Sequence, residues 1–166
     1  MVRPFASAPM SPSSTPEADT PVRRQRWLSV MAKAPSGRLE ALWRGIGQVP
    51  SYIMLRRPEI GLVMVKGRIS GSGAPFCAGE MTVTRAAVRL HSGQIGIGYV
   101  GGRHPRQAEI AATIDALGHL PEWHEEIEAK IVTPLAAEAE ARQRLAAAKA
   151  AATKVDFFTV AREAGT

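Results

Sequence analysis

The amino-acid sequence predicts an α+β fold, with an antiparallel sheet of about four strands on which N-terminal and C-terminal helices pack. Apolar residues recur at helical spacing before residue 48 and after residue 104, whereas the segment between them has the shorter period of β-strands. The link His91-Ser92-Gly93 joins the last two strand segments. So short a link indicates a hairpin, and therefore antiparallel pairing.

The 166 residues, 45% of them hydrophobic, suit one domain with a single core. We divide the chain into a disordered Pro/Ser-rich tail at 1–19, an α+β core domain at 20–133, and an alanine-rich helix with a docking tail at 134–166. Cys77 is the only cysteine, and the sequence shows neither a secretory signal nor an apolar run of membrane-spanning length. We therefore expect a cytoplasmic protein without disulfides or membrane association.

Two helices are expected at the start of the core domain. Thr20 and Pro21 suit the N-cap and first position of one helix, whose apolar stripe includes Trp27 and Met31. Ser36 suits the N-cap of the next helix, in which apolar residues recur at helical spacing: Leu39, Leu42, Trp43 and Ile46.

Four strand segments follow, at 52–55, 62–69, 81–90 and 94–100. Pro58 and Gly61 separate the first two, because proline lacks the N–H that a strand ladder uses and glycine weakens a strand. The 70–79 connection is too long for a tight turn. Its three glycines indicate positive φ or a close approach of the backbone to another group: Gly71, Gly73 and Gly79.

The C-terminal part is expected to be helical. Pro105 opens one helix and Gly118 ends it, and a further apolar stripe is centred on Ile127. Thr133, followed by proline, suits the N-cap of a last helix that runs to about Thr153. This helix is rich in alanine and has few large apolar side chains, so it is a poor core element.

The net charge of +6 is unevenly distributed. Residues 51–106 contain eight Lys and Arg against two Glu, whereas residues 107–166 contain six basic against ten acidic residues. The basic sheet suits an anion or an acidic partner. Nucleic acid is not favoured, because Phe76 and Tyr99 alone supply aromatic rings within the basic segment.

The strongest local pattern is the glycine turn at Gly102-Arg103, where a strand ends and the Pro105 helix begins. Free N–H groups and the positive end of the helix dipole favour a phosphate or carboxylate there, which Arg103 can bind. A plain strand-to-helix turn with solvated arginines fits the pattern equally well.

Further candidates flank the glycine loop, where Glu80 can pair with Arg68 or Arg85. We favour a buried, paired Arg85 over a clamp for phosphate or a partner carboxylate. Asp115 is interpreted as a polar helix residue that can anchor an arginine. The complete set of anion, nucleotide or interface candidates is Arg68, Gly71, Gly73, Glu80, Thr84, Arg85, Gly102, Arg103 and Asp115.

No pattern of catalytic residues is present, because no nucleophile is accompanied by a base and an orienting group. The four histidines do not have the spacing of a metal site, so we assign neither a catalytic residue nor a metal ligand. Near the C-terminus, Phe157 and Phe158 form an apolar end that we expect to dock on a partner.

These residues resemble those of the PhnG family, subunits of the bacterial carbon–phosphorus lyase core complex. Ser70 stands where the family often has another glycine, and the extension before Thr20 is additional. The resemblance covers all but the N-terminal tail and a few terminal residues, and includes Gly71-Ser72-Gly73, Ala78-Gly79-Glu80, the run from Thr82 to Leu90, Gly102-Arg103, Ile114-Asp115-Ala116-Leu117 and Val155-Asp156-Phe157-Phe158-Thr159.

The resemblance implies a non-autonomous accessory subunit of the synthase that makes α-D-ribose 1-methylphosphonate 5-triphosphate from ATP and methylphosphonate, with release of adenine. It implies direct binding to PhnI, with PhnH and PhnJ in the same core complex and two copies of each. It implies no cofactor on this chain, since the complex uses ATP, and the iron–sulfur cluster with S-adenosylmethionine belongs to PhnJ. The alternative is that the Gly/Arg-rich sheet surface binds the nucleotide triphosphate or the phosphonate directly.

Overall fold

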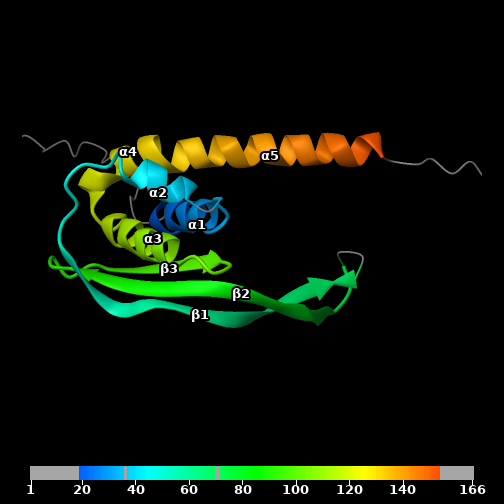
Figure 1. The fold of residues 1–166 in the computed structure, drawn as a ribbon, viewed down its shortest axis with the longest axis horizontal. Helices are drawn as coiled ribbons and strands as arrows, with labels where there is room; N and C mark the ends of the chain where they lie inside the picture. The colour runs from blue at the N-terminus through cyan, green and yellow to red at the C-terminus, as the bar shows by residue number, and fades with distance from the viewer. Residues whose placement is uncertain (1–18, 36, 70–71, 154–166) are drawn as a thin grey trace, which may run out of the picture.

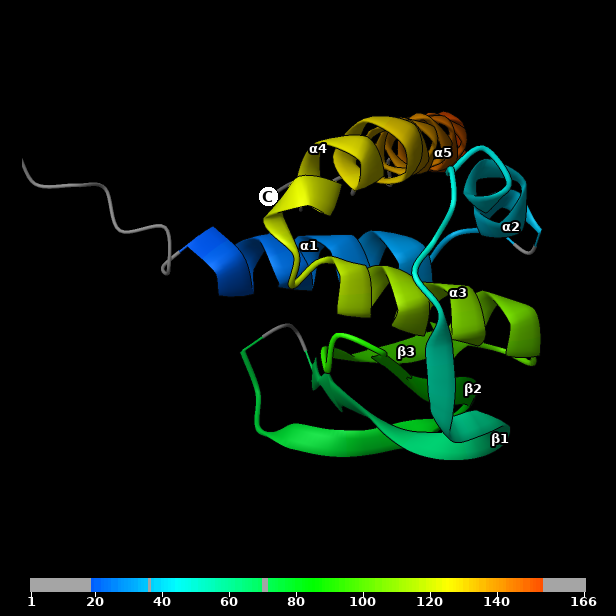
Figure 2. The ribbon, with the colours of Figure 1, turned by 90° about the vertical axis from the view of Figure 1, so that its left-hand side faces the viewer.

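The computed structural model describes residues 19–35, 37–69 and 72–153. The elements follow in the order α1 (Asp19–Ala32), α2 (Arg38–Trp43), β1 (Tyr52–Arg68), β2 (Pro75–Leu90), β3 (Ile95–Gly101), α3 (Pro105–Leu117), a 3₁₀ turn (Pro121–Trp123), α4 (His124–Ile127), a π-helical turn (Glu128–Val132) and α5 (Thr133–Ala152). Both strand pairs are antiparallel, so the predicted α+β class is confirmed. Figures 1 and 2 show all helices on one side of the sheet, with α1 and α3 nearest to it and α4 and α5 above them.

In the described residues the sheet has three strands, in the order β1-β2-β3, rather than about four. The segments predicted as separate strands on either side of Pro58 form the single strand β1, which pairs with β2 along its length. Register shifts between Met54 and Arg56 and between Arg56 and Glu59 accommodate the proline. Because β1 is an edge strand, the missing N–H at an irregular position costs little there.

Helix α3 lies directly on β3 because both surfaces consist of small residues. A Cβ atom added to Gly98 would lie 1.9 Å from the carbonyl oxygen of Ala108, and one added to Gly96 would lie 2.0 Å from that of Ala112. Both alanines are fully buried. The backbone of the strand therefore approaches the backbone of the helix more closely than any larger residue permits.

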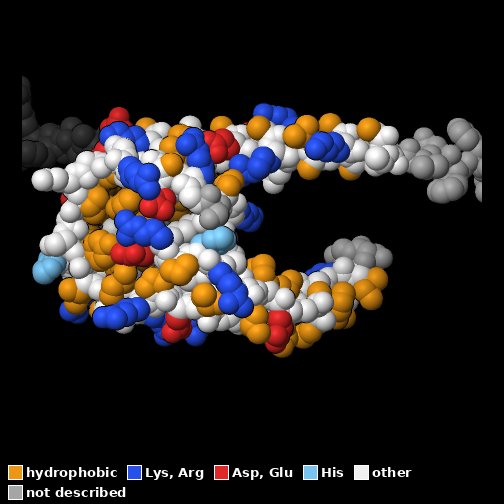
Figure 3. Space-filling view, viewed as in Figure 1, with side chains coloured by type: hydrophobic (Ala, Val, Ile, Leu, Met, Phe, Trp, Pro, Cys, Tyr) orange, Lys and Arg blue, Asp and Glu red, His pale blue; other side chains and the backbone are white. Residues whose placement is uncertain are grey.

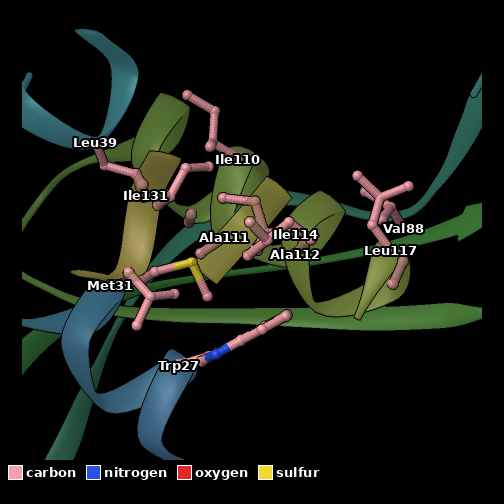
Figure 4. Close-up of a cluster of buried hydrophobic side chains, with 14 of the residues drawn as sticks. Trp27, Met31, Leu39, Val88, Ile110, Ala111, Ala112, Ile114, Leu117 and Ile131 are labelled. Atoms are coloured by element: carbon pink, nitrogen blue, oxygen red, sulfur yellow. The ribbon is translucent and has the colours of Figure 1, made fainter. Parts of the chain in front are cut away.

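Apolar side chains from the helices and the sheet close one core (Figure 4). Trp27 and Met31 of α1 are 3% and 0% exposed, and Leu39 of α2 is 1% exposed. They pack with Ile114 of α3 and Ile131 of the π-helical turn, which are fully buried. The predicted helical stripe that includes Trp27 and Met31 is confirmed, whereas α2 ends at Trp43, so that Ile46 is buried but lies beyond the helix predicted to contain it.

The helix predicted to begin at Thr133 continues an existing one. The preceding residue, Val132, already has helical backbone angles, with φ −71° and ψ −48°, so Thr133 is not an N-cap. Pro134 lacks an N–H, and its ring would clash with the carbonyl of residue 130 in a regular helix. The π-helical turn Glu128–Val132 directly precedes this proline and relieves the conflict.

Two elements project from the body in the same direction (Figure 1). Strand β1 pairs with β2 from Pro75 to Leu90, but β3 pairs with β2 only from Val83 to Arg89. The two-stranded remainder, residues 62–68 and 75–82, is called the hairpin arm below. The other projection is α5, and Figure 3 shows an open notch between the two.

Candidate functional site

The predicted Gly102-Arg103 turn is held in place by Thr84. The Thr84 side chain is fully buried, and its Oγ1 donates a 2.7 Å hydrogen bond to the carbonyl of Gly102 and accepts one of 2.9 Å from the N–H of His104. Gly102 has φ 83°, a left-handed conformation that favours glycine. Thr84 and Gly102 therefore shape the connection between β3 and α3.

This turn borders a hollow of about 210 Å³ at the N-terminus of α3. Arg106 is paired with Glu109 at 2.9 Å, and this hydrogen bond raises the pKa of Arg106. Arg103, in contrast, makes no ion pair within the described residues. The hollow offers cations and a helix N-terminus together with one acid, and its lining consists of Gly37, Glu40, Arg103, His104, Pro105, Arg106 and Gln107.

Arg68, Gly73 and Glu80 belong to the hairpin arm and its tip. The Arg68 Nη1 donates a 3.0 Å hydrogen bond to the carbonyl of Gly73, which closes the connection between β1 and β2. Glu80 is exposed opposite Met64 and makes no ion pair with a described residue. Gly71 lies outside the described residues.

Arg85 lies on the opposite face of the sheet from Thr84, because successive strand residues alternate. Its Nε contacts Oε1 of Glu59 at 2.5 Å, and Arg56 donates to the same oxygen at 2.6 Å. The hydrogen bond from Arg85 lowers the pKa of Glu59. Arg85 is paired as expected, but its side chain is 47% exposed, so the predicted burial is wrong and its partner is not Glu80.

Asp115 connects α1, α3 and β3. Its side chain is 1% exposed and binds Arg24 bidentately, at 2.7 Å to Nε and 2.9 Å to Nη2. Its Oδ2 also accepts a 2.8 Å hydrogen bond from the N–H of Ile97. The hydrogen bond to Asp115 raises the pKa of Arg24. The prediction that Asp115 anchors an arginine is confirmed, and the arginine comes from α1.

The candidate residues therefore occupy separate places: the strand-to-helix turn, the hairpin arm, the outer sheet face and the core. Within 19–35, 37–69 and 72–153, no group of three His, Cys, Asp or Glu side chains could hold a metal ion. Phe157 and Phe158 lie outside the described residues. Sequence reasoning missed Glu59 as the partner of Arg85, although it is one of only two acids in residues 51–106.

Comparison with known proteins gives the family. The model of the family described as phosphonate metabolism protein PhnG matches residues 22–163. The chain is also 41% identical over 140 residues to the alpha-D-ribose 1-methylphosphonate 5-triphosphate synthase subunit PhnG of Rhizobium meliloti (strain 1021), a match that covers 84% of this chain and 89% of that protein. The chain belongs to the PhnG family. The resemblance inferred from sequence motifs is thus confirmed.

This PhnG family member also exposes large apolar side chains. Large hydrophobic side chains on the hairpin arm, at its base and at its tip are between 40% and 71% exposed: Ile60, Leu62, Met64, Val65, Ile69, Phe76 and Met81. A two-stranded hairpin is marginally stable by itself, and an exposed apolar patch of this kind marks an interaction site. Among the described helices of this PhnG chain, none is long and apolar enough to cross a membrane.

Proposed function

We propose that this chain is a non-autonomous accessory subunit of α-D-ribose 1-methylphosphonate 5-triphosphate synthase, acting in the cytoplasm in phosphonate catabolism. The family match and the 41% identical relative, itself named as a subunit of that synthase, support the proposal. In this proposal the chain binds PhnI directly and joins PhnH and PhnJ in the carbon–phosphorus lyase core complex. The complex transfers the ribosyl triphosphate of ATP to methylphosphonate and releases adenine.

The exposed apolar side chains of the hairpin arm are the observation that best supports a role as a subunit of a complex. Leu62 and Met64 are 63% and 60% exposed, on a strand whose only described neighbour here is β2. Full burial of a side chain of this size contributes about 1.5–3 kcal/mol. A partner that covers the arm therefore gains several such contributions, and the arm gains the packed surface that it lacks in the isolated chain.

Helix α5 adds a second surface that the chain does not cover itself. Leu135 is its one buried residue, although the helix has 20 residues, all of them described. Glu138 of α5 pairs with Arg38 of α2 at 2.6 Å. Arg144 approaches Glu140 at 3.9 Å, but this pair lies within α5 itself. Projecting alongside the hairpin arm, α5 borders the notch seen in Figure 3.

A double substitution, Leu62→Ser with Met64→Ser, tests this function in the chain co-expressed with PhnH, PhnI and PhnJ. Both side chains are exposed, so the isolated variant should keep its unfolding midpoint, whereas recovery of the complex and adenine release from ATP and methylphosphonate should fall together. Val22→Ser, at a side chain 66% exposed on α1, is the matched control. The proposal fails if the unmodified chain does not assemble with these subunits, or catalyses adenine release alone.

Direct binding of a nucleotide triphosphate or phosphonate is the second candidate function. It is favoured by the hollow of about 210 Å³ at the N-terminus of α3, beside Arg103. If this function is correct, Arg103→Ala raises the KM for ATP or methylphosphonate in the assembled complex without changing assembly. Calorimetry of the isolated chain with ATP separates a site on this chain from one that is completed by a neighbour.

The docking role of Phe157 and Phe158 stays a prediction. The pair of substitutions Phe157→Ala and Phe158→Ala should abolish co-purification with PhnI. A complex recovered at the usual yield with both substitutions would assign docking to other surfaces, such as the hairpin arm.

A further inference from the structure

The face of the sheet that points away from the helices is covered by no described element (Figure 1). The pairing register arranges nine of its residues in three cross-strand rows, and we call them the outer sheet face: Ile53-Arg89-Ile95, Arg56-Ala87-Ile97 and Glu59-Arg85-Tyr99. The intervening β2 residues Ala86, Val88 and Leu90 are buried under the helices, which confirms that these rows face outward.

Apolar side chains line the β3 side of this face and one end of its β1 side. Ile53 on β1 is 43% exposed, and on β3 Ile95 and Ile97 are each 48% and Tyr99 43% exposed. At the end of the face near the β2–β3 turn lies a hollow of about 420 Å³, whose lining includes Ile53, Ile95 and the side of Arg89. An antiparallel sheet can leave one face to solvent, but that face is then mostly polar, whereas this one also exposes three isoleucines and a tyrosine.

Charged side chains lie on the middle strand and on the β1 side of the same face. Arg56 and Arg85 share the single carboxylate of Glu59, at 2.6 and 2.5 Å. Arg89, between Ile53 and Ile95, makes no ion pair with a described residue. Three arginines against one glutamate leave the face with a net charge of +2. An occupant therefore needs apolar groups over the β3 side and Ile53, and a carboxylate that reaches Arg89.

These requirements argue against other occupants. Two copies that dock by this face around a two-fold axis would bring like charges together. A nucleic acid would find one aromatic ring, Tyr99, and would leave three isoleucine side chains without apolar partners. Apolar groups, a tyrosine and arginines are instead the composition of the central part of protein–protein interfaces.

We propose that the outer sheet face docks a polypeptide segment of another subunit, with large apolar side chains over the isoleucines and a carboxylate on Arg89. This inference rests on the proposed function, because it requires a complex with other chains. It assigns docking to a surface separate from the hairpin arm and α5.

Hydroxyl-radical footprinting of the isolated chain and of its complex with PhnH, PhnI and PhnJ tests the surface itself. We expect oxidation of Tyr99 to fall about fivefold or more on assembly, as for a side chain that becomes buried in an interface core. The side chain of Val22, 66% exposed on α1, serves as the reference within the same molecule. Unchanged oxidation of Tyr99 in an intact complex overturns the inference and leaves the proposed function standing.

The variant Arg89→Glu tests the charge of the outer sheet face. Lys33→Glu, at an exposed lysine just after α1, is the control of equal charge change. Arg89→Glu should weaken association with the other subunits about tenfold or more, because it opposes the carboxylate of the partner. Equal affinity of both variants overturns the inference.

A test of self-association separates this inference from docking of a second copy. If the isolated chain self-associates and becomes monomeric on Ile97→Ser, the inference is overturned in favour of a second copy. Failure of the unmodified chain to join any complex removes the proposed function instead.

Discussion

Thr84 and Gly102 are joined by a 2.7 Å hydrogen bond that connects the middle strand of the sheet to the turn before α3. The same Thr84 oxygen accepts the N–H of His104, so the residues on both sides of Arg103 depend on one hydroxyl. Since Thr84 is fully buried, water has little access to this side of the turn. The position of the Arg103 backbone therefore follows from a residue on another strand.

Replacing Thr84 by valine, which keeps the shape and removes the hydroxyl, should lower the free energy of unfolding by about 1–3 kcal/mol. The loss arises because a carbonyl and an N–H lose their partner. Urea denaturation of the isolated chain measures it. Thr82→Val is the control, since Thr82 is partly exposed on the same strand face, and its effect should stay within about 0.5 kcal/mol. Equal losses in the two variants would contradict this role of Thr84.

The Arg24–Asp115 pair should behave as one unit in a double-mutant cycle. Asp115→Asn should cost about 2–3 kcal/mol, less than the 3–5 kcal/mol of a fully buried pair, because the Arg24 side chain is 43% exposed. With Arg24→Gln as the second change, the coupling energy should be about 1–3 kcal/mol. The exposed pair Arg44–Glu40 should give about 0.2–0.5 kcal/mol in the same measurement. Additive effects of the two substitutions at Arg24 and Asp115 would show that the pair is not coupled.

The helices could be predicted because their apolar period is local. The spacing of Trp27 and Met31, and the Pro105 and Gly118 boundaries of α3, need no knowledge of neighbouring elements. The continuity of β1 across Pro58 could not be predicted this way, because proline is tolerated only where the strand lies at an edge and the register shifts. Edge position and register are properties of the assembled sheet.

The candidate site was predicted by residue type, and the structure distributes those residues among four places. Thr84 and Arg85 are adjacent in sequence, so strand alternation alone separates them, and this could have been predicted. The Glu59–Arg85 pair spans 26 residues and depends on the register of β1 against β2. The contact between Gly98 and α3 could have been predicted from two patterns: alternate glycines on β3, Gly96 and Gly98, and alanines four residues apart on α3, Ala108 and Ala112.

The close approach of Gly98 to α3 predicts a large loss of stability when a side chain is added. Gly98→Ala should destabilise the chain by about 3 kcal/mol or more, because the new methyl group would overlap the carbonyl oxygen of Ala108 and force α3 off the sheet. Gly61→Ala on β1 is the control, since nothing lies within 4 Å of its added Cβ, and its effect should be small. Soluble yield and the urea midpoint measure both. Similar stabilities of the two variants would mean that α3 does not lie against β3 at this distance.

The carboxylate of Glu128 should make stability depend on pH in acid. Arg26 Nη1 donates to both of its oxygens at 2.8 and 2.9 Å, and Trp27 Nε1 donates at 2.7 Å. Burial raises the pKa of Glu128, but the hydrogen bonds from Arg26 and Trp27 together outweigh it, so that the net pKa lies below the usual 4.5. The unfolded chain therefore binds a proton at a higher pH than the folded chain does.

It follows that the contribution of Glu128 is fully present above the unfolded-state pKa of about 4.5 and is lost as the pH falls through the folded-state value. The difference in free energy of unfolding between the unmodified chain and Glu128→Gln should be largest near neutral pH and should shrink below about pH 4.5. Urea titrations between about pH 7 and pH 3 measure this difference. Glu125→Gln, at an exposed acid on α4, should give a curve parallel to that of the unmodified chain. If the curve of Glu128→Gln is also parallel, the hydrogen bonds from Arg26 and Trp27 do not stabilise the charged carboxylate.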